Sequence, residues 1–260
     1  MMEKQETSIR LIRNATLKIQ YGGHTILVDP LLAEKASLIS ALGVNVSPRV
    51  HLTMPVSEVV KDVDTVLLTH NHLDHYDPSV KGYLPSDVLF LTQPQDRETI
   101  ANDGFSNVVA IDDVFKTDRI SITRVAGKHG RGILGDMMGA VSGFVFSCEG
   151  LPTLYLMGDC CWDDVIRDTV SLYNPDYMIV NSGGAIIPVY SGYFGSIIVN
   201  ENDMAEIMTE CTGVKKFIAV HMDAIDHCQT TRSILRNEIS HRELDLNRLI
   251  IPEDGETIVL

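Results

Sequence analysis

Three histidines and one aspartate lie within six residues of one another, at His70, His72, Asp74 and His75. The apolar run VDTVLLT (63–69) comes directly before them and is typical of a central strand. Residues two apart on an extended chain project to the same side, so His70 and His72 are expected to face one point. Asp74 and His75 follow as the chain turns and are expected to face a second point nearby. Imidazole and carboxylate groups at this density indicate a metal site more than a polar loop.

Three further strand-like runs also end in a residue that can bind metal: ISITRVAGK before His129, TLYLMG before Asp159 and KFIAV before His221. Taken alone, either histidine is more often a polar core residue, and Asp159 could cap the helix that follows it. Together the candidate ligands are His70, His72, Asp74, His75, His129, Asp159 and His221. They suffice for two ions with three protein ligands each and one bridging carboxylate, which leaves a position for water, as catalytic sites do.

The elements expected to position these ligands alternate along the chain. Residues 15–30 predict a β-hairpin that turns at Gly22 and Gly23, and residues 31–50 are helix-like or loop. Strands are predicted at 63–69, 88–92, 107–111, 120–126, 140–147, 153–159, 176–181 and 215–221. Helices are predicted at 95–103, 163–173 and 201–211, and a last helix to about residue 240. No linker or repeat interrupts this pattern, so residues 1–260 are predicted to form a single domain with helix-covered sheets.

The composition limits the classes of function. The formal net charge of −14 disfavours nucleic-acid partners, which are polyanions, and leaves a small-molecule substrate as the expectation. No apolar stretch reaches the roughly 18 residues of a membrane span, and the opening MMEKQETSIR does not resemble a signal peptide. The five cysteines form no disulfide pattern, so a reducing, cytoplasmic location is expected. The apolar, glycine-containing segment 183–200 is expected to form a pocket wall, a contact in a homo-oligomer, or an irregular part of the core.

The motif HNHLDH (70–75) resembles the HxHxDH motif of the metallo-β-lactamase superfamily. The later ligands match in order, in GKHG, GDC and AVHMD, so that the resemblance covers nearly the whole chain. The residues Tyr76 and Asp77 after the motif, MGAVSGFVF, and AVHMDAIDHC are most similar to the group that includes L-ascorbate-6-phosphate lactonase. The sequence departs from the family in reading GDC where GDT is usual. The resemblance implies an α/β fold of four layers, an αββα sandwich with the metal ions at the edge between two mixed sheets.

The resemblance also implies roles for the ligands. His70, His72 and His129 would hold one divalent ion, Asp74, His75 and His221 the second, and Asp159 would bridge. Zinc is implied by the superfamily and manganese by the ascorbate-phosphate group, with iron less favoured. The expected activity is that of a metal-dependent hydrolase, in which hydroxide bound between the ions attacks a lactone or ester, with a sugar-phosphate lactone the leading substrate.

Several other residues near the motifs are candidates for the reaction. Asp74 is counted as a catalytic residue as well as a ligand, and His227 could protonate a leaving group, unless it is an ordinary histidine of the last helix. Asp29 could orient a ligating imidazole, or serve only as the turn residue before a proline. Lys128 and Arg131 could bind a phosphate or carboxylate of the substrate, or be solvated charges.

Other activities remain open from the sequence. A phosphodiesterase would use the same two-ion site. A persulfide dioxygenase would use a single iron held by His70, His129 and Asp159. A non-catalytic metal-binding protein of the same fold is the third alternative, although seven ligands with an open water position exceed what binding alone requires.

Overall fold

Two mixed sheets of seven strands each pack face to face in the computed structural model, which describes residues 7–39 and 46–260. In spatial order the first sheet consists of β16 (Thr257–Val259), β1 (Ser8–Arg13), β2 (Thr16–Tyr21), β3 (His24–Val28), β6 (Thr65–Leu67), β7 (Leu89–Thr92) and β8 (Val108–Ala110). The second consists of β15 (Leu249–Ile250), β14 (Lys216–Val220), β13 (Tyr177–Asn181), β12 (Leu154–Leu156), β11 (Ser142–Ser147), β10 (Ser121–Ala126) and β9 (Val114–Lys116).

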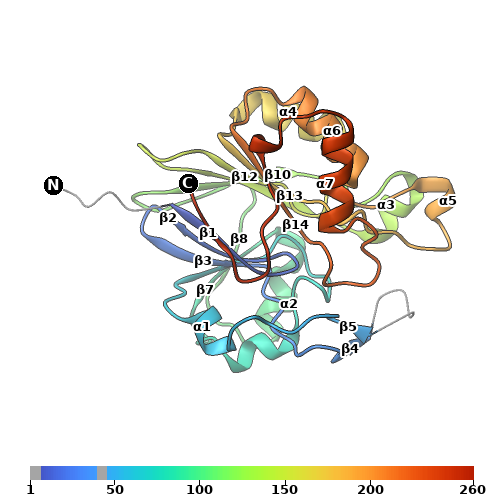
Figure 1. Cartoon of the computed structure of the whole chain (residues 1–260). Coiled ribbons are helices and arrows are strands. Elements are labelled where there is room, and N and C mark those ends of the chain that lie inside the picture. The colour runs from blue at the N-terminus through green and yellow to red at the C-terminus, as the bar shows by residue number, and fades with distance from the viewer. Residues whose placement is uncertain (1–6, 40–45) are drawn as a thin grey trace.

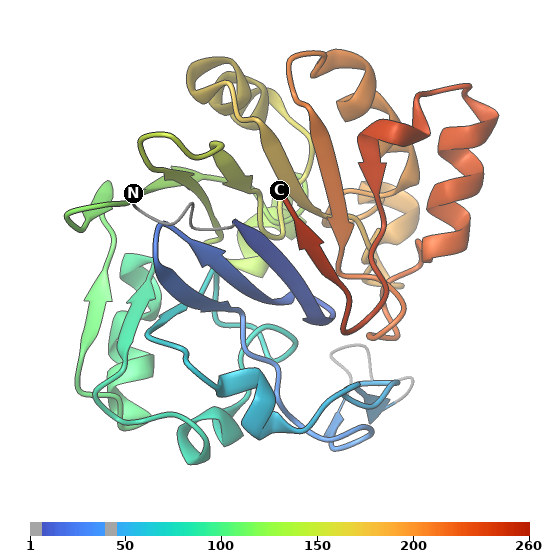
Figure 2. The same ribbon diagram turned by 60° about the vertical axis from the view of Figure 1, so that its left-hand side comes forward.

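Each sheet is antiparallel at one side and parallel at the other. In the first, β16, β1, β2 and β3 pair antiparallel, while β3, β6, β7 and β8 run parallel. In the second, β9 to β12 pair antiparallel and β12 to β15 run parallel. The last strand lies beside the first one, so the two ends of the described chain meet in one sheet (Figure 2). The parallel strands matter for the site, because their carboxyl ends share one edge.

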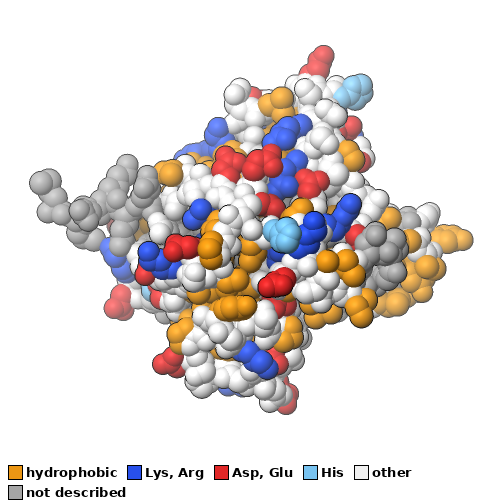
Figure 3. Space-filling model, turned by 60° about the horizontal axis from the view of Figure 1, so that its bottom comes forward, with side chains coloured by type: hydrophobic (Ala, Val, Ile, Leu, Met, Phe, Trp, Pro, Cys, Tyr) orange, Lys and Arg blue, Asp and Glu red, His pale blue; other side chains and the backbone are white. Residues whose placement is uncertain are grey.

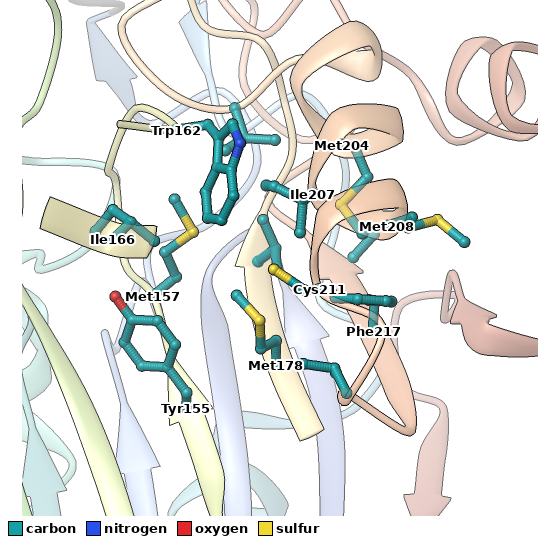
Figure 4. Packing of buried hydrophobic residues seen from close by; sticks show 14 of the residues in the cluster. Tyr155, Met157, Trp162, Ile166, Met178, Met204, Ile207, Met208, Cys211 and Phe217 are labelled. Atoms are coloured by element: carbon teal, nitrogen blue, oxygen red, sulfur yellow. The ribbon is translucent and has the colours of Figure 1, made fainter. Parts of the chain in front are cut away.

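Apolar side chains fill three layers. The layer between the sheets contains alternate residues of facing strands, such as Ile19 of β2 and Phe144 of β11. Helices α4 (Asp164–Tyr173), α6 (Glu201–Glu210) and α7 (Arg232–His241) cover the outer face of the second sheet. Figure 4 shows how side chains of α4 and α6 pack there. Helices α1 (Val56–Val60) and α2 (Arg97–Asn102) cover the first (Figure 1). The predicted αββα sandwich is therefore confirmed.

The predicted secondary structure agrees with most of these elements. The hairpin of β2 and β3 turns at Gly22 and Gly23, which both have positive φ. Strand β1 was not predicted, because Arg10 and Arg13 make it look polar, although Arg13 is fully buried. The helix-like interpretation of 31–50 was wrong for the described part, which contains only loop and the short strands β4 (Leu38–Ile39) and β5 (Val46–Ser47). Its residues 40–45 lie outside the described residues.

The smaller elements gather at one edge of the sandwich. Helices α3 (Gly132–Met138) and α5 (Ser191–Phe194) and the pair β4 and β5 lie on the same side, at the right in Figure 1. Three 3₁₀ turns complete the described elements: η1 (Pro78–Gly82), η2 (Pro94–Asp96) and η3 (Leu246–Arg248). The segment 183–200 contains α5 and also buried residues such as Ile198, so it is in part an irregular piece of the core.

Candidate metal centre

The candidate ligands follow the ends of four strands from both sheets. His70 comes three residues after β6, and His129 comes three residues after β10. Asp159 comes three residues after β12, and His221 directly follows β14. Because the carboxyl ends of β6, β12 and β14 lie at the edge shared by the two sheets, residues far apart in sequence meet there.

His70, His72 and His129 form a first cluster, in which one ligand atom of each lies within 4.8 Å of the others. Nε2 of His70 lies 2.9 Å from Nδ1 of His72, and the His70 and His129 rings stand at right angles with centroids 5.2 Å apart. The ligand atoms of all three side chains therefore converge, and these are the three histidines that the family resemblance assigns to the first ion.

Asp74, His75 and His221 form a second cluster within the same limit. Nε2 of His75 lies 3.0 Å from Nε2 of His221, and Oδ2 of Asp74 lies 3.4 Å from that same His221 atom. Both histidines are fully buried. A carboxylate and two imidazoles thus converge next to the first cluster.

Asp159 lies between the two clusters. Its Oδ2 atom is 3.2 Å from Nε2 of His75, 3.5 Å from Nε2 of His129 and 3.6 Å from Nε2 of His221. Its other oxygen, Oδ1, accepts a hydrogen bond of 2.6 Å from Nδ2 of Asn181. One oxygen is thus held by the protein, while the other is shared between the clusters. Asp163, and not Asp159, caps helix α4, by accepting from the backbone of Ile166.

The outer ring nitrogens test whether this set suits a metal ion. A ligating imidazole needs an unprotonated inner nitrogen, which is favoured when the outer nitrogen faces a hydrogen-bond acceptor. Every histidine of the two clusters meets this condition: the pairs are His70 with Thr69 Oγ1 (3.1 Å), His72 with Met138 O (3.1 Å), His75 with Asp29 Oδ2 (2.8 Å), His129 with Ile197 O (3.1 Å) and His221 with Cys228 Sγ (3.3 Å). The donor set therefore fits divalent ions.

Charge is distributed unequally over the clusters. Burial lowers the pKa of His129 to about 4 and holds the pKa of His70 well below its usual range, so both are neutral. Burial also acts to lower the pKa of His75, but Asp159 and Asp29 outweigh it and raise that pKa to about 10. Burial would raise the pKa of Asp159, but His221 and His75 hold it well below its usual range. Asp159 is thus ionised, as a ligand must be.

A cavity of about 300 Å³ opens onto both clusters. His72 and His129 line it from the first cluster and Asp74 from the second, and Asp159 lies between them. The rest of its wall is mainly aliphatic and comes from the small elements at this edge: Leu38, Ile39, Leu73, Met138, Ile197 and Ile225. Ile197 makes segment 183–200 a pocket wall, one of the roles expected for it. Figure 3 shows hydrophobic side chains gathered on this side of the molecule, where Ile39 is 83% exposed.

His227, the candidate proton donor, lies at the cavity but not on a helix. His227 lines the cavity with Nε2 3.7 Å from Oδ2 of Asp74, but it lies in a loop, because helix α7 begins only at Arg232. The expectation that it belongs to the last helix was wrong, since His221 and Asp223 have positive φ and turn the chain there. Burial lowers the pKa of His227, so its ring is neutral.

The two basic candidates do not reach the aliphatic cavity. Lys128 lies 3.7 Å from Asp163 and Arg131 lies 3.5 Å from Asp203, and neither lines the cavity at the clusters. Lys128 lines a second cavity together with His129 and the glycine-rich residues around it. Their charges are thus paired with carboxylates, in agreement with the alternative of solvated surface charges.

The side chains that contact the candidate ligands include three that were not identified from the sequence. Thr69 and Cys228 face His70 and His221, and Asn181 holds Asp159. Asn181 ends β13, the strand between those that precede Asp159 and His221, so the rule of shared strand ends would have found it. The other two carry no pattern, because their partners are set by the course of the loops.

The comparisons with known proteins agree with this geometry. A family model described as "Beta-lactamase superfamily domain" matches residues 8–212. The chain belongs to the metallo-β-lactamase superfamily. Within this superfamily, UPF0173 protein YddR of Bacillus subtilis is 32% identical over 96% of this chain and 98% of its own length. A UPF0173 metal-dependent hydrolase of Rubrobacter xylanophilus is 23% identical over 70% of this chain and 72% of its own.

Two solved structures are similar over nearly the whole length. The structure of a possible metal-dependent hydrolase from Veillonella parvula has a TM-score of 0.91 and 30% identity, and covers 98% of this chain and 100% of its own. The isothiocyanate hydrolase from Delia radicum gut bacteria has a TM-score of 0.89 and 32% identity, and covers 97% and 99%. The chain described here is thus a metal-dependent hydrolase of the UPF0173 family. None of these relatives is named a lactonase, so the narrower resemblance stays a prediction.

The structure also bears on the expected absence of a membrane span. Within residues 7–39 and 46–260, no helix has the length and hydropathy needed to cross a bilayer.

Proposed function

We propose that this chain hydrolyses a small, uncharged electrophile that carries an apolar substituent. One observation supports this most directly: the cavity at both clusters has an aliphatic wall and, among the described residues, no lysine or arginine lines it. A phosphorylated lactone whose carbonyl carbon faced the ions would place its phosphate against this aliphatic wall, where no lysine or arginine of the described residues could pair with it. An uncharged lactone or ester meets no such penalty, and so it is favoured over a sugar-phosphate lactone.

The two clusters would hold two divalent ions, one at His70, His72 and His129 and one at Asp74, His75 and His221, with Asp159 shared. Such ions act as Lewis acids and make water nucleophilic near neutral pH. The residues of the chain then have separate tasks. Asn181 fixes the orientation of Asp159, and the aliphatic wall holds the apolar part of the substrate and excludes bulk water. The neutral imidazole of His227 faces the cavity and can donate a hydrogen bond to a heteroatom of the substrate.

A second candidate substrate is an isothiocyanate. The specific observation in its favour is the 32% identity, over 97% of this chain, to the isothiocyanate hydrolase from Delia radicum gut bacteria. An isothiocyanate is small, uncharged and electrophilic at its central carbon, and its substituent is commonly apolar. Addition of one water gives an N-substituted thiocarbamic acid, which splits into an amine and carbonyl sulfide. The cavity suits this substrate for the same reasons that it suits an uncharged ester.

A substrate panel tests the proposal. Metal-loaded protein is assayed with an uncharged lactone, an aryl ester, an alkyl and an aryl isothiocyanate, a phosphorylated lactone and bis(p-nitrophenyl) phosphate. We expect saturable turnover of at least one uncharged substrate and none of the two phosphates. Release of amine from the isothiocyanates, or of acid from the lactone, decides between the two candidates.

Variants tie the turnover to the clusters. His129→Ala should lose both bound metal and turnover, measured by elemental analysis and by the same assays, with near two metal ions in the wild-type chain. His241→Ala, at the exposed end of α7, is the control and should match the wild type. Turnover of the phosphodiester alone would contradict the proposal. One iron per chain with oxygen consumption would favour the dioxygenase, and full metal occupancy without any turnover would favour a non-catalytic protein.

A further inference from the structure

The outer partner of His221 differs from those of the other histidines at the centre. In the described chain, the outer nitrogens of His70, His72, His75 and His129 face oxygen atoms, whereas Nδ1 of His221 faces the sulfur of Cys228 at 3.3 Å. The inner nitrogen of His221, Nε2, lies among Asp74, His75 and Asp159. The ring therefore connects the Cys228 sulfur directly to the second cluster.

The loop holds this sulfur in a defined place. Residues 221 and 223 have positive φ, so the chain turns back and the backbone of Cys228 bonds to Ile225 and bridges to Ala185. Gly183 packs against the same sulfur, since a Cβ atom there would come within 2.8 Å of Sγ and 2.1 Å of the His221 carbonyl oxygen. Only 7% of Cys228 is exposed. Little room remains for water to replace the sulfur as the partner of Nδ1.

We propose that Cys228 is a positioning residue of the second metal position, because its sulfur accepts the Nδ1 proton of His221. With Nδ1 protonated, Nε2 presents its lone pair to the cluster, whereas the opposite tautomer would place a proton there. Cys228 thereby sets both the tautomer and the direction of the ring. This inference rests on the two-ion centre of the proposed function, but not on any substrate.

The strength of the effect follows from the chemistry of sulfur. A thiol sulfur is a weak acceptor, unlike the carboxylate oxygen of Asp29 that faces His75 at 2.8 Å. Removing Cys228 should therefore weaken the second position less than removing the charge of Asp29. The three histidines of the first cluster have outer hydrogen-bond partners other than Cys228, so the affinity of the first position for its metal ion should not change.

The experiment compares single substitutions in the full chain by titration with Zn²⁺ and Co²⁺ against a chelator. Cys228→Ala should weaken binding of the second ion by about tenfold, the lower end of what such partners contribute, and leave the first ion unchanged. Cys228→Ser keeps an acceptor and should restore most of the affinity. The visible absorption of bound Co²⁺, which reports ligand geometry, should change in the alanine variant for the second ion only.

Cys211→Ala is a matched control. Cys211 is also 7% exposed, but it packs among core residues such as Met178 and Phe217, as Figure 4 shows, and faces none of the histidines. Its loss should lower the melting temperature and leave both metal affinities unchanged. If Cys228→Ala does not fold, Cys228→Val removes the acceptor while filling the space, and the same result is expected.

Three outcomes would overturn the inference. The first is wild-type affinity for the second ion in Cys228→Ala or Cys228→Val, and the second is an equal loss of that affinity in Cys211→Ala. The third is a wild-type chain that binds one ion only. The first two outcomes are distinct from failure of the proposed function, whereas a single bound ion would contradict the two-ion centre on which both rest. A chain whose metal affinities respond as expected, but which turns over no uncharged substrate, would contradict the proposed substrate class and leave the role of Cys228 intact.

Discussion

Oδ2 of Asp29 lies 2.8 Å from Nδ1 of His75, although 46 residues separate them in sequence. The same oxygen accepts the hydroxyl of Thr69 at 2.8 Å, and that hydroxyl oxygen faces Nδ1 of His70 at 3.1 Å. One buried carboxylate thus orients one histidine of each cluster, the first through a hydroxyl and the second directly. Asp29 has φ of +44°, a conformation that ordinary residues adopt at a cost and that occurs often at functional sites.

Asp29→Asn should weaken metal binding by about 10- to 100-fold, the range found when such outer partners are lost. Asparagine tolerates positive φ and keeps the shape of the side chain, so the change removes mainly the charge. The measurement is metal content after dialysis against a graded chelator. Asp64→Asn is the matched control, because Asp64 also faces a histidine, His24, but at the surface. Retention of wild-type metal affinity in Asp29→Asn would argue against its orienting role.

The stability of the metal-free protein should be greatest near pH 6.5 and decline on both sides. The folded pKa of His75 is raised to about 10, so its contribution is complete below the unfolded value of about 6.5 and is lost as pH rises toward 10. The folded pKa of His129 is lowered to about 4, so the unfolded chain takes up its proton first and stability falls as pH drops from about 6.5.

Thermal unfolding between pH 4 and pH 10 measures this dependence. Saturating Zn²⁺ should raise the melting temperature. It should also make the melting temperature depend less on pH around neutrality, because the ion replaces the protons on the inner nitrogens. A metal-free melting temperature that stayed constant from pH 5 to pH 9 would show that these histidines do not titrate as their surroundings predict.

Lys128→Ala and Arg131→Ala should leave kcat/KM for uncharged substrates within about twofold of the wild type, as expected for exposed ion pairs that contribute little. Both side chains are paired with carboxylates, Asp163 and Asp203, and neither lines the cavity at the clusters. Steady-state kinetics of the two variants on the best substrate of the panel test this. A large rise in KM for either variant would restore that residue as a substrate contact.

Arg13→Met should destabilise the fold by about 3 kcal/mol or more, because three carbonyl oxygens would each lose a hydrogen bond from a charged donor. Arg13 donates to the carbonyl oxygens of Leu31, Ala33 and Val50, while Asp77 accepts from the backbone of the same segment. Denaturant unfolding measures the change, with Arg236→Met on the exposed face of α7 as the control. An equal effect in both variants would show that the buried contacts of Arg13 are not essential.

The same contacts explain why the helix-like part of the prediction for residues 31–50 was wrong where the structure describes them. Their spacing of apolar residues resembles a helix, but the backbone of residues 31–33 bonds to the side chains of Arg13 and Asp77. Local propensity is a weak determinant when buried charges from distant residues compete for the backbone. Strand β1 was missed for a different reason, because Arg10 and Arg13 make it look polar, although it pairs with β2 and with β16 from the other end of the described chain.

The sequence by itself predicted helix-covered sheets and the set of candidate ligands, because strand periodicity and the dense HNHLDH motif are local properties, and the resemblance of that motif implied the four-layer sandwich. Apolar runs that end in His70, His129, Asp159 and His221 were enough to predict that these side chains meet. Only the tertiary structure decided what surrounds them: the partners Asp29, Thr69 and Cys228, the aliphatic wall, and the pairing of Lys128 and Arg131 away from it. These depend on loops whose course is set by contacts between distant residues, and local sequence does not encode such contacts.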